Sequence, residues 1–166
     1  MLTNNFACLL NLVCSEQSSY STMFKSVTGA EISLQYTTMG NTLGRGQSLL
    51  IKSSEVTDTL GYYLTLGTGT TPPKSTDIAL ENLTENYTIL TQTKSNPIIY
   101  SDTIFTITRV IENTSENDLT ISEVGLYACV ASRTEKQVIM LAREVIEPIT
   151  LASGEKHSFT LNLCVQ

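Results

Sequence analysis

Hydrophobic and polar residues alternate along much of this chain with a period of two, the spacing of a strand that buries one face. The alternation is plain in residues 31–37 (EISLQYT), where every second position from Ile32 onward is apolar or aromatic. Further segments rich in β-branched and aromatic residues are 48–52, 62–66, 87–93, 138–146 and 158–165. Turn-rich stretches separate these segments, so the pattern predicts a series of short antiparallel strands.

The strongest local pattern is a strand, a turn and a second strand over residues 103–131. The segments TIFTITRVIEN and LTISEVGLYACVA flank the polar turn TSEND at 114–118. Two β-rich segments joined by a short polar turn are typical of a β-hairpin. We therefore expect these two strands to pair with each other.

The first residues follow a different period, which predicts a short helix over residues 2–16. Thr3 suits the N-cap position, and apolar residues spaced for one helical face follow it. These residues are Phe6, Leu9, Leu10 and Val13. Residues 15–21 (SEQSSYS) are predicted to form a loop. The helix could act as an arm that packs on another subunit, or it could cap the sheet of its own chain.

Together these elements predict an all-β fold, an antiparallel β-sandwich of jelly-roll-like form with a short N-terminal helix or arm. We assign residues 1–24 to the helix, or arm, and its linker, and residues 25–166 to a single β-sandwich domain. At 166 residues with 41% hydrophobic content, the chain is long enough to bury a substantial core.

Composition narrows the classes of partner. The formal net charge is −6, and the ten Lys and Arg residues form no basic stripe, so we expect no nucleic-acid binding. The apolar run at residues 6–14 is too short to span a membrane, and we expect no membrane partner. Only 16% of residues are charged, against ~25% in typical soluble domains. We therefore expect much of the surface to lie against protein partners, including further copies of the chain.

The residues that could carry chemistry do not form a recognisable site. The single histidine, His157, has no Cys or second His at metal-ligand spacing, and no Gly-x-Ser-x-Gly sequence is present. The four cysteines form no CxxC pair. We expect buried free thiols, no catalytic residue, no metal, no cofactor and no enzymatic activity.

A rigid loop follows the strand at residues 62–66. Gly67 and Gly69 allow a tight turn, and Pro72 and Pro73 stiffen its exit and remove two backbone donors that a phosphate loop needs. A short helical turn is predicted over residues 75–82. We interpret Gly67, Gly69, Pro72 and Pro73 as part of an interface with a neighbouring protein, together with the apolar face of the N-terminal helix.

Four carboxylate and guanidinium side chains remain to be placed. Asp77 and Glu81 lie four apart and could share a helical face, as a calcium site or an acid/base pair, although capping and solvation are expected. Glu123 and Arg143 each lie inside an apolar strand, where an unpaired charge is costly. We predict a structural ion pair between them if their strands are neighbours; a catalytic carboxylate is the alternative.

Several segments occur in an order that resembles a known family. They are GTGTTPP at 67–73, DIALE at 77–81, ISEVGLY at 121–127 and LAR at 141–143, and the chain begins Met-Leu-Thr-Asn-Asn-Phe. This order is similar to that of small tail- or head-associated structural proteins of bacteriophages, over most of residues 60–163. The resemblance implies a virion protein that assembles in several copies with other particle proteins, as a tail, collar or capsid-surface component.

A function of a different class is the alternative. β-sandwich modules also bind carbohydrates or receptors, usually through exposed aromatic rings. The chain has no Trp, but Tyr62, Tyr63, Tyr87 and Tyr100 could take that role.

Overall fold

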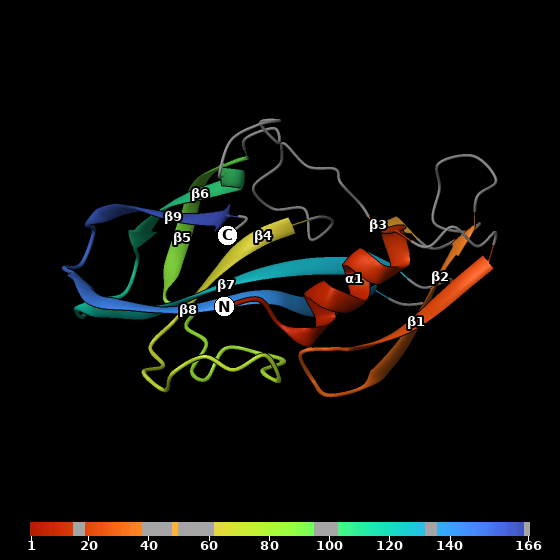
Figure 1. Ribbon diagram of the computed structural model, residues 1–166. Coiled ribbons are helices and arrows are strands. Elements are labelled where there is room, and N and C mark those ends of the chain that lie inside the picture. The colour runs from red at the N-terminus through yellow and green to blue at the C-terminus, as the bar shows by residue number, and fades with distance from the viewer. Residues whose placement is uncertain (15–18, 38–47, 50–61, 95–102, 132–135, 165–166) are drawn as a thin grey trace.

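A computed structural model describes residues 1–14, 19–37, 48–49, 62–94, 103–131 and 136–164 (Figure 1). The elements in these residues are α1 (Asn4–Cys14), β1 (Ser19–Lys25), β2 (Glu31–Thr37), β3 (Ser48–Leu49), β4 (Tyr62–Gly67), β5 (Tyr87–Lys94), β6 (Thr103–Asn113), β7 (Leu119–Ala131), β8 (Lys136–Leu151) and β9 (Lys156–Cys164). The predicted fold class is confirmed, since antiparallel sheets pack together in a sandwich-like arrangement with one short N-terminal helix.

The larger sheet has four strands and is centred on β7. One edge of β7 pairs with β4 and then with β3, and the other edge pairs with β8. The register between β7 and β8 shifts near Pro148, because Ile121 pairs with Ile149 whereas Glu123 pairs with Val145. A proline has no N–H for the ladder and is tolerated at such an irregularity. The chain start extends the sheet beyond β8, through a bridge between Leu2 and Ala142.

The smaller sheet has the order β5-β6-β9, and its place corrects the predicted hairpin. Both strands of residues 103–131 are present, but β6 pairs with β5 and β9, whereas β7 pairs with β3, β4 and β8. The turn between them therefore crosses from one sheet to the other. Asn113 fixes this crossing, because its side chain donates to the carbonyls of Asn117 and Leu151 at 2.9 Å. A sandwich corner and a hairpin share one local pattern, so the sequence did not distinguish them.

β1 and β2 form a separate two-stranded ladder, on the right in Figure 1. The prediction of a loop through residue 21 was wrong, because β1 begins at Ser19. β1 contains few apolar residues. Its pairing with β2 and the burial of Phe24, which is 1% exposed, hold the strand in place. β1 runs across the boundary drawn at residue 24, and of the strand predicted at 48–52 only Ser48–Leu49 lies in the described residues.

The core lies between the two larger sheets. Its fully buried side chains include Leu64, Leu66, Ile107, Ile111, Ile121, Leu126, Ile139, Leu141 and Leu151. Phe24 of β1 and Leu9 of α1 belong to the same cluster. At ~25 cal/mol per Å² of buried apolar surface, this cluster is the main source of stability of the fold.

The opposite face of the four-stranded sheet is also covered. The chain after β4 passes beneath this face, on the side away from β5, β6 and β9 (Figure 1). Leu80 from this connection packs there against Tyr127 and Met140. Since both faces of β7 are covered, every residue from Ile121 to Ala128 is buried, polar ones included.

Candidate functional site: an ion-pair network beneath the four-stranded sheet

Glu123 and Arg143 lie on the covered outer face of the sheet, on β7 and β8. Glu123 pairs in register with Val145 and Gly125 pairs with Arg143, so the two charged residues are diagonal neighbours on one face. Arg143 Nε donates to Glu123 Oε1 at 2.5 Å. The Glu123 side chain is 0% exposed and the Arg143 side chain is 4% exposed. The ion pair predicted from the sequence is thus present, and it is buried.

Glu123 also binds the backbone of the connection between β4 and β5, which we call the docked segment (residues 67–84). Its Oε1 accepts a hydrogen bond from the N–H of Glu81 at 2.8 Å. Its Oε2 accepts from the N–H groups of Gly69 at 3.2 Å and Asn82 at 3.4 Å. One buried carboxylate therefore holds both ends of the docked segment against the sheet.

Arg143 uses the rest of its guanidinium on the same segment. Nη1 donates to Asp77 Oδ2 at 2.7 Å, and Nη2 donates to the carbonyl of Thr71 at 3.1 Å and lies 3.5 Å from Glu81 Oε2. Burial alone lowers the pKa of this guanidinium, but its bonds to Asp77 and Glu123 and their charges outweigh burial and raise the pKa. Arg143 is therefore charged and bridges three carboxylates.

Asp77 and Glu81 complete the network. Glu81 accepts from the hydroxyl of Thr71 at 2.6 Å and from the N–H groups of Thr70 and Thr71, and these bonds, with the charge of Arg143, lower its pKa despite some burial. Burial raises the pKa of Asp77. A hydrogen bond from the Lys74 N–H at 2.8 Å and the bond and charge of Arg143 lower this pKa by more than burial raises it, so the net shift is downward. Both carboxylates are held in the ionised form.

The three carboxylates thus accept hydrogen bonds from backbone N–H groups throughout the docked segment. The donors are Gly69, Thr70, Thr71, Lys74, Glu81 and Asn82. These bonds outnumber the guanidinium contacts, and they spread the negative charge over fixed dipoles. The arrangement therefore stabilises one backbone shape of the docked segment.

The predicted helical turn at residues 75–82 is absent. The backbone makes a turn at Lys74–Asp77, where the Asp77 N–H donates to the Lys74 carbonyl at 3.1 Å, and then continues without helix. The N–H groups that a helix would use bind the sheet instead: that of Leu80 donates to the Tyr127 hydroxyl at 2.9 Å, and that of Glu81 to Glu123. Partners distant in sequence thus replaced the local hydrogen bonds that the pattern suggested.

Gly67 and Gly69, at the start of the docked segment, are buried against Glu123, and they provide space for its carboxylate. A Cβ on Gly67 would lie 2.5 Å from Glu123 Oε2, and one on Gly69 would lie 2.6 Å from the same atom. Neither glycine has a positive φ, so close approach is the reason for glycine here. Of the two prolines, Pro72 is exposed and Pro73 is half-buried. These prolines, unlike the glycines, are placed where a neighbour could contact them.

The chain start contacts the same network. The N-terminal amine of Met1 donates to the Arg143 carbonyl at 2.5 Å, and the Arg143 N–H donates to the Met1 carbonyl at 2.9 Å. The N–H of Asn4 donates to the carbonyl of Ser75 at 2.7 Å. The first residues therefore bind the ion-pair strand and the docked segment together.

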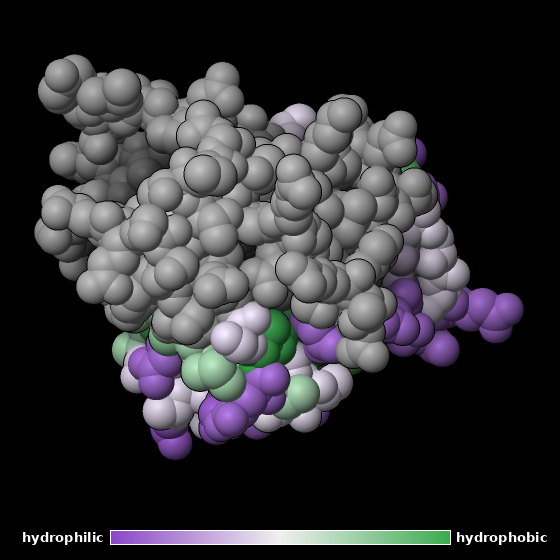
Figure 2. All heavy atoms as spheres, turned by 90° about the vertical axis from the view of Figure 1, so that its right-hand side faces the viewer, coloured by the Kyte–Doolittle hydropathy of each residue, from purple (hydrophilic) through white to green (hydrophobic). Residues whose placement is uncertain are grey.

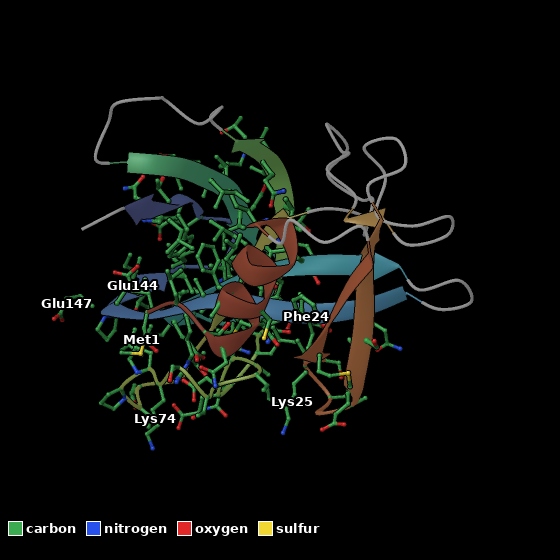
Figure 3. The ribbon with its side chains drawn as sticks, turned by 45° about the vertical axis from the view of Figure 1, so that its right-hand side comes forward. Met1, Phe24, Lys25, Lys74, Glu144 and Glu147 are labelled. Carbon is green, nitrogen blue, oxygen red and sulfur yellow. The ribbon has the colours of Figure 1, made fainter. Side chains whose placement is uncertain are left out.

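A pocket of about 140 Å³ lies where α1, the end of β1 and residues 75–78 meet. The amide of Asn5 borders it, but its Nδ2 donates to the carbonyl of Lys25 and its Oδ1 accepts from the N–H of Lys25. This buried amide already has its partners within the chain. Lys25 and Lys74 point outward on this side of the molecule (Figure 3).

The apolar face of α1 packs on its own chain where it is described. Leu9 is 7% exposed within the core cluster, and the half-buried Phe6 packs against it. The side chains of Leu10 and Val13 lie outside the described part. In the described residues the helix therefore packs on its own chain, which is the second of the two interpretations given for it above.

At this end of the molecule hydrophobic and hydrophilic residues lie side by side on the described surface, and Met23 of β1 is 51% exposed (Figure 2).

A second buried cation, Arg109, lies between the sheets and was not anticipated. Its Nε donates to Gln92 Oε1 at 3.0 Å, and its guanidinium lies 5.6 Å from the ring centre of Tyr63. Burial lowers the pKa of Arg109, and a bond to Tyr87 opposes that effect. Tyr63 and Tyr87 are thus half-buried beside this cation. The side chain of Tyr62 and the whole of Tyr100 lie outside the described residues.

Among the residues with a described structure, no three or more metal-binding side chains gather as a metal site would require. No helix in the same part of the chain is long and apolar enough to cross a membrane. Cys8 is a free, half-buried thiol.

In comparisons with known proteins, no family model, no curated protein and no solved structure matches the chain.

Proposed function

We propose that this chain is a structural subunit of a bacteriophage particle and that it assembles with other virion proteins through the docked segment. The observation that carries the proposal is that the segments resembling phage structural proteins all meet at one site. The docked segment contains residues 67–73 and 77–81. Glu123 comes from the segment 121–127, and Arg143 comes from the segment 141–143. The chain start binds the backbone of Arg143.

The physics of the docked segment supports a docking role. Its backbone is fixed from within by buried groups, while Thr70, Thr71, Pro72 and Lys74–Thr76 are exposed. A loop that is ordered before binding loses little conformational entropy when a partner binds, so more of the contact energy appears as affinity. A subunit that must dock repeatedly and in one geometry benefits from such a surface.

The alternative, a carbohydrate- or receptor-binding module, stays a prediction. Tyr63 and Tyr87, the candidate aromatic residues that are described, contact Arg109 inside the molecule. No described contact favours sugar binding over assembly.

The direct test is quantitative mass spectrometry of particles purified from the strain that carries the gene. We expect the chain to co-sediment with particles at a fixed ratio to the major capsid subunit. Absence of the chain from intact particles, with the protein present in the lysate, would contradict the proposal.

A matched pair of variants tests the docked segment itself. Thr76 is exposed on the docked segment and Thr114 is exposed in the turn between β6 and β7. We expect Thr76→Arg to lower incorporation into particles and Thr114→Arg to leave it unchanged. Equal incorporation of both variants would show that the chain docks through another surface.

A further inference from the structure

The face of the β5-β6-β9 sheet that points away from the core carries small polar side chains and few charges. Ile107, Arg109 and Ile111 of β6 are buried on the core side, so the alternate residues of the strand, such as Thr106 and Thr108, point outward. Thr93, Thr108 and Thr160 are cross-strand neighbours in one row. Thr93 and Thr160 are exposed and Thr108 is half-buried.

The hydroxyl groups of this face bond to one another across the strands. Thr108 and Thr160 share a hydrogen bond of 2.9 Å between their hydroxyls, and Thr106 donates to the side-chain oxygen of Asn162 at 2.8 Å. A polar group that keeps a hydrogen bond after burial avoids most of the desolvation cost. The methyl groups of the threonines are then free to pack. This face is therefore inexpensive to remove from water.

Charges appear in the row at one end of the face. Glu112 on β6 and Lys156 on β9 pair in register, and Lys156 Nζ lies 3.8 Å from Glu112 Oε2. Their side chains are 32% and 61% exposed, so both remain accessible to a partner. The row thus places one positive and one negative charge side by side on neighbouring strands.

We propose that this face binds the same face of a second copy of the chain, with a two-fold axis that runs along the strands between β6 and β9. This rotation lays β6 of one copy over β9 of the other and keeps the rows aligned. Glu112 of each copy then faces Lys156 of the other, and Thr108 faces Thr160. The pairing is isologous, as in most homodimers.

Charge favours a second copy at this face. Each chain carries a net charge of −6, so two copies repel at most orientations. The central rows contribute no charge, and the end row is complementary to itself under the proposed rotation. These two features reduce the repulsion at this face and specify the register.

The size of the face sets the expected strength. Under the proposed rotation β6 and β9 of one copy face β9 and β6 of the other, and these two strands, ~4.8 Å apart and about eight residues long, offer roughly 250 Å² per copy. This is about a third of the ~800 Å² per partner that stable complexes bury, so we expect weak, concentration-dependent association. Weak contacts of this kind are useful in a particle with many copies, and in this respect the inference rests on the proposed function.

Sedimentation velocity of the full chain over a concentration series, in reducing buffer, tests the interface. Glu112→Lys places two lysines opposite each other and Lys156→Glu places two glutamates opposite each other. We expect each variant alone to associate roughly tenfold more weakly than the wild type. Glu112→Lys is expected to weaken association although it makes the net charge less negative, so general charge repulsion between copies cannot explain the weaker association.

The decisive arm mixes the two variants. In a mixed dimer, both facing pairs are again of opposite charge, so we expect association to return to near the wild-type level. The stability of each separate chain does not change on mixing, so recovery reports the contact between chains. Thr108→Arg, in the centre of the face, should abolish association in every mixture.

Glu147→Lys is the control of matched charge. Glu147 lies on β8, is exposed, and points away from the ribbon at the left edge of Figure 3. We expect this variant to associate at least as well as the wild type.

Three results would overturn the inference. They are a wild type that stays monomeric up to roughly 1 mM, single variants that associate normally, and a mixture that does not recover. None of them changes the particle measurement above, so failure of this interface and failure of the proposed function are distinguishable.

Discussion

The two faces of the four-stranded sheet are buried by different means. On the inner face, Leu64, Leu66 and Leu126 pack against the second sheet and are fully buried. On the outer face, Glu123 and Arg143 are equally buried but bind the docked segment through ion pairs and hydrogen bonds. Apolar contacts tolerate small shifts, whereas a buried charge network requires one arrangement. The inner face therefore holds the fold together, and the outer face fixes the shape of one surface loop.

Removal of Glu123 should give the largest effect. Glu123→Ala leaves Arg143 without its closest partner and three backbone N–H groups without an acceptor. Loss of one partner from a buried pair costs about 3–5 kcal/mol of unfolding free energy. Urea denaturation measures this loss. Glu123→Gln keeps the shape and removes only the charge, and it should cost less; a neutral effect of both variants would contradict the role of the network.

Truncation of an apolar side chain on the inner face should cost a similar unfolding free energy but should loosen a different set of amides. Leu64→Ala removes a fully buried side chain from the core, which costs about 2–5 kcal/mol. We expect faster hydrogen exchange throughout both sheets in this variant. In Glu123→Gln we expect faster exchange in residues 67–84 alone. If both variants loosen the same amides, the two faces are not energetically distinct.

The glycines separate steric from conformational effects. Gly69→Ala places a Cβ 2.6 Å from Glu123 Oε2 and should destabilise by about 1–3 kcal/mol, measured as a shift in the urea midpoint. Gly154→Ala is the control, because its φ of 77° disfavours Ala although nothing lies within 4 Å of the new Cβ. We expect a cost of about 1 kcal/mol there. A smaller effect at Gly69 than at Gly154 would argue against close packing of the docked segment.

The inner face was the more predictable of the two. Its alternation of apolar residues correctly predicted most strands and the sandwich class, because burial of one strand face imposes that period. The predicted hairpin at 103–131 failed, since pairing partners depend on contacts distant in sequence. The Glu123–Arg143 pair was predictable, because a charge inside an apolar strand requires a partner.

The rest of the outer face could not be deduced in the same way. Asp77 and Glu81 were expected on a helical turn, and nothing local indicated that both would bind Arg143, more than sixty residues away. The structure packs Gly67 and Gly69 against Glu123, a contact that nothing local in the sequence indicated, and their place in an interface with a neighbouring protein stays a prediction. Position in the fold, which the local pattern does not encode, decided these roles.

A smaller effect is expected from pH. The pKa values of Asp77 and Glu81 are lowered in the folded chain, so the unfolded chain binds more protons as the pH falls. Their stabilisation is fully present above the ordinary carboxyl pKa values and is lost over the acid range below roughly pH 5, as the pH falls through the lowered pKa values of the folded chain. In thermal denaturation across this range, Asp77→Asn should show a shallower loss of stability than the wild type. An identical slope would show that Asp77 does not contribute.

The most direct test of the central claim is hydrogen exchange at individual amides of the wild-type chain, followed by NMR at neutral pH. The backbone N–H groups of Gly69, Glu81 and Asn82 bind Glu123, so we expect their protection to fall sharply in Glu123→Gln while Leu64 and Leu126 in the core stay protected. If those three amides already exchange rapidly in the wild type, Glu123 does not hold the docked segment, and the claim that the buried ion pair fixes its shape is wrong.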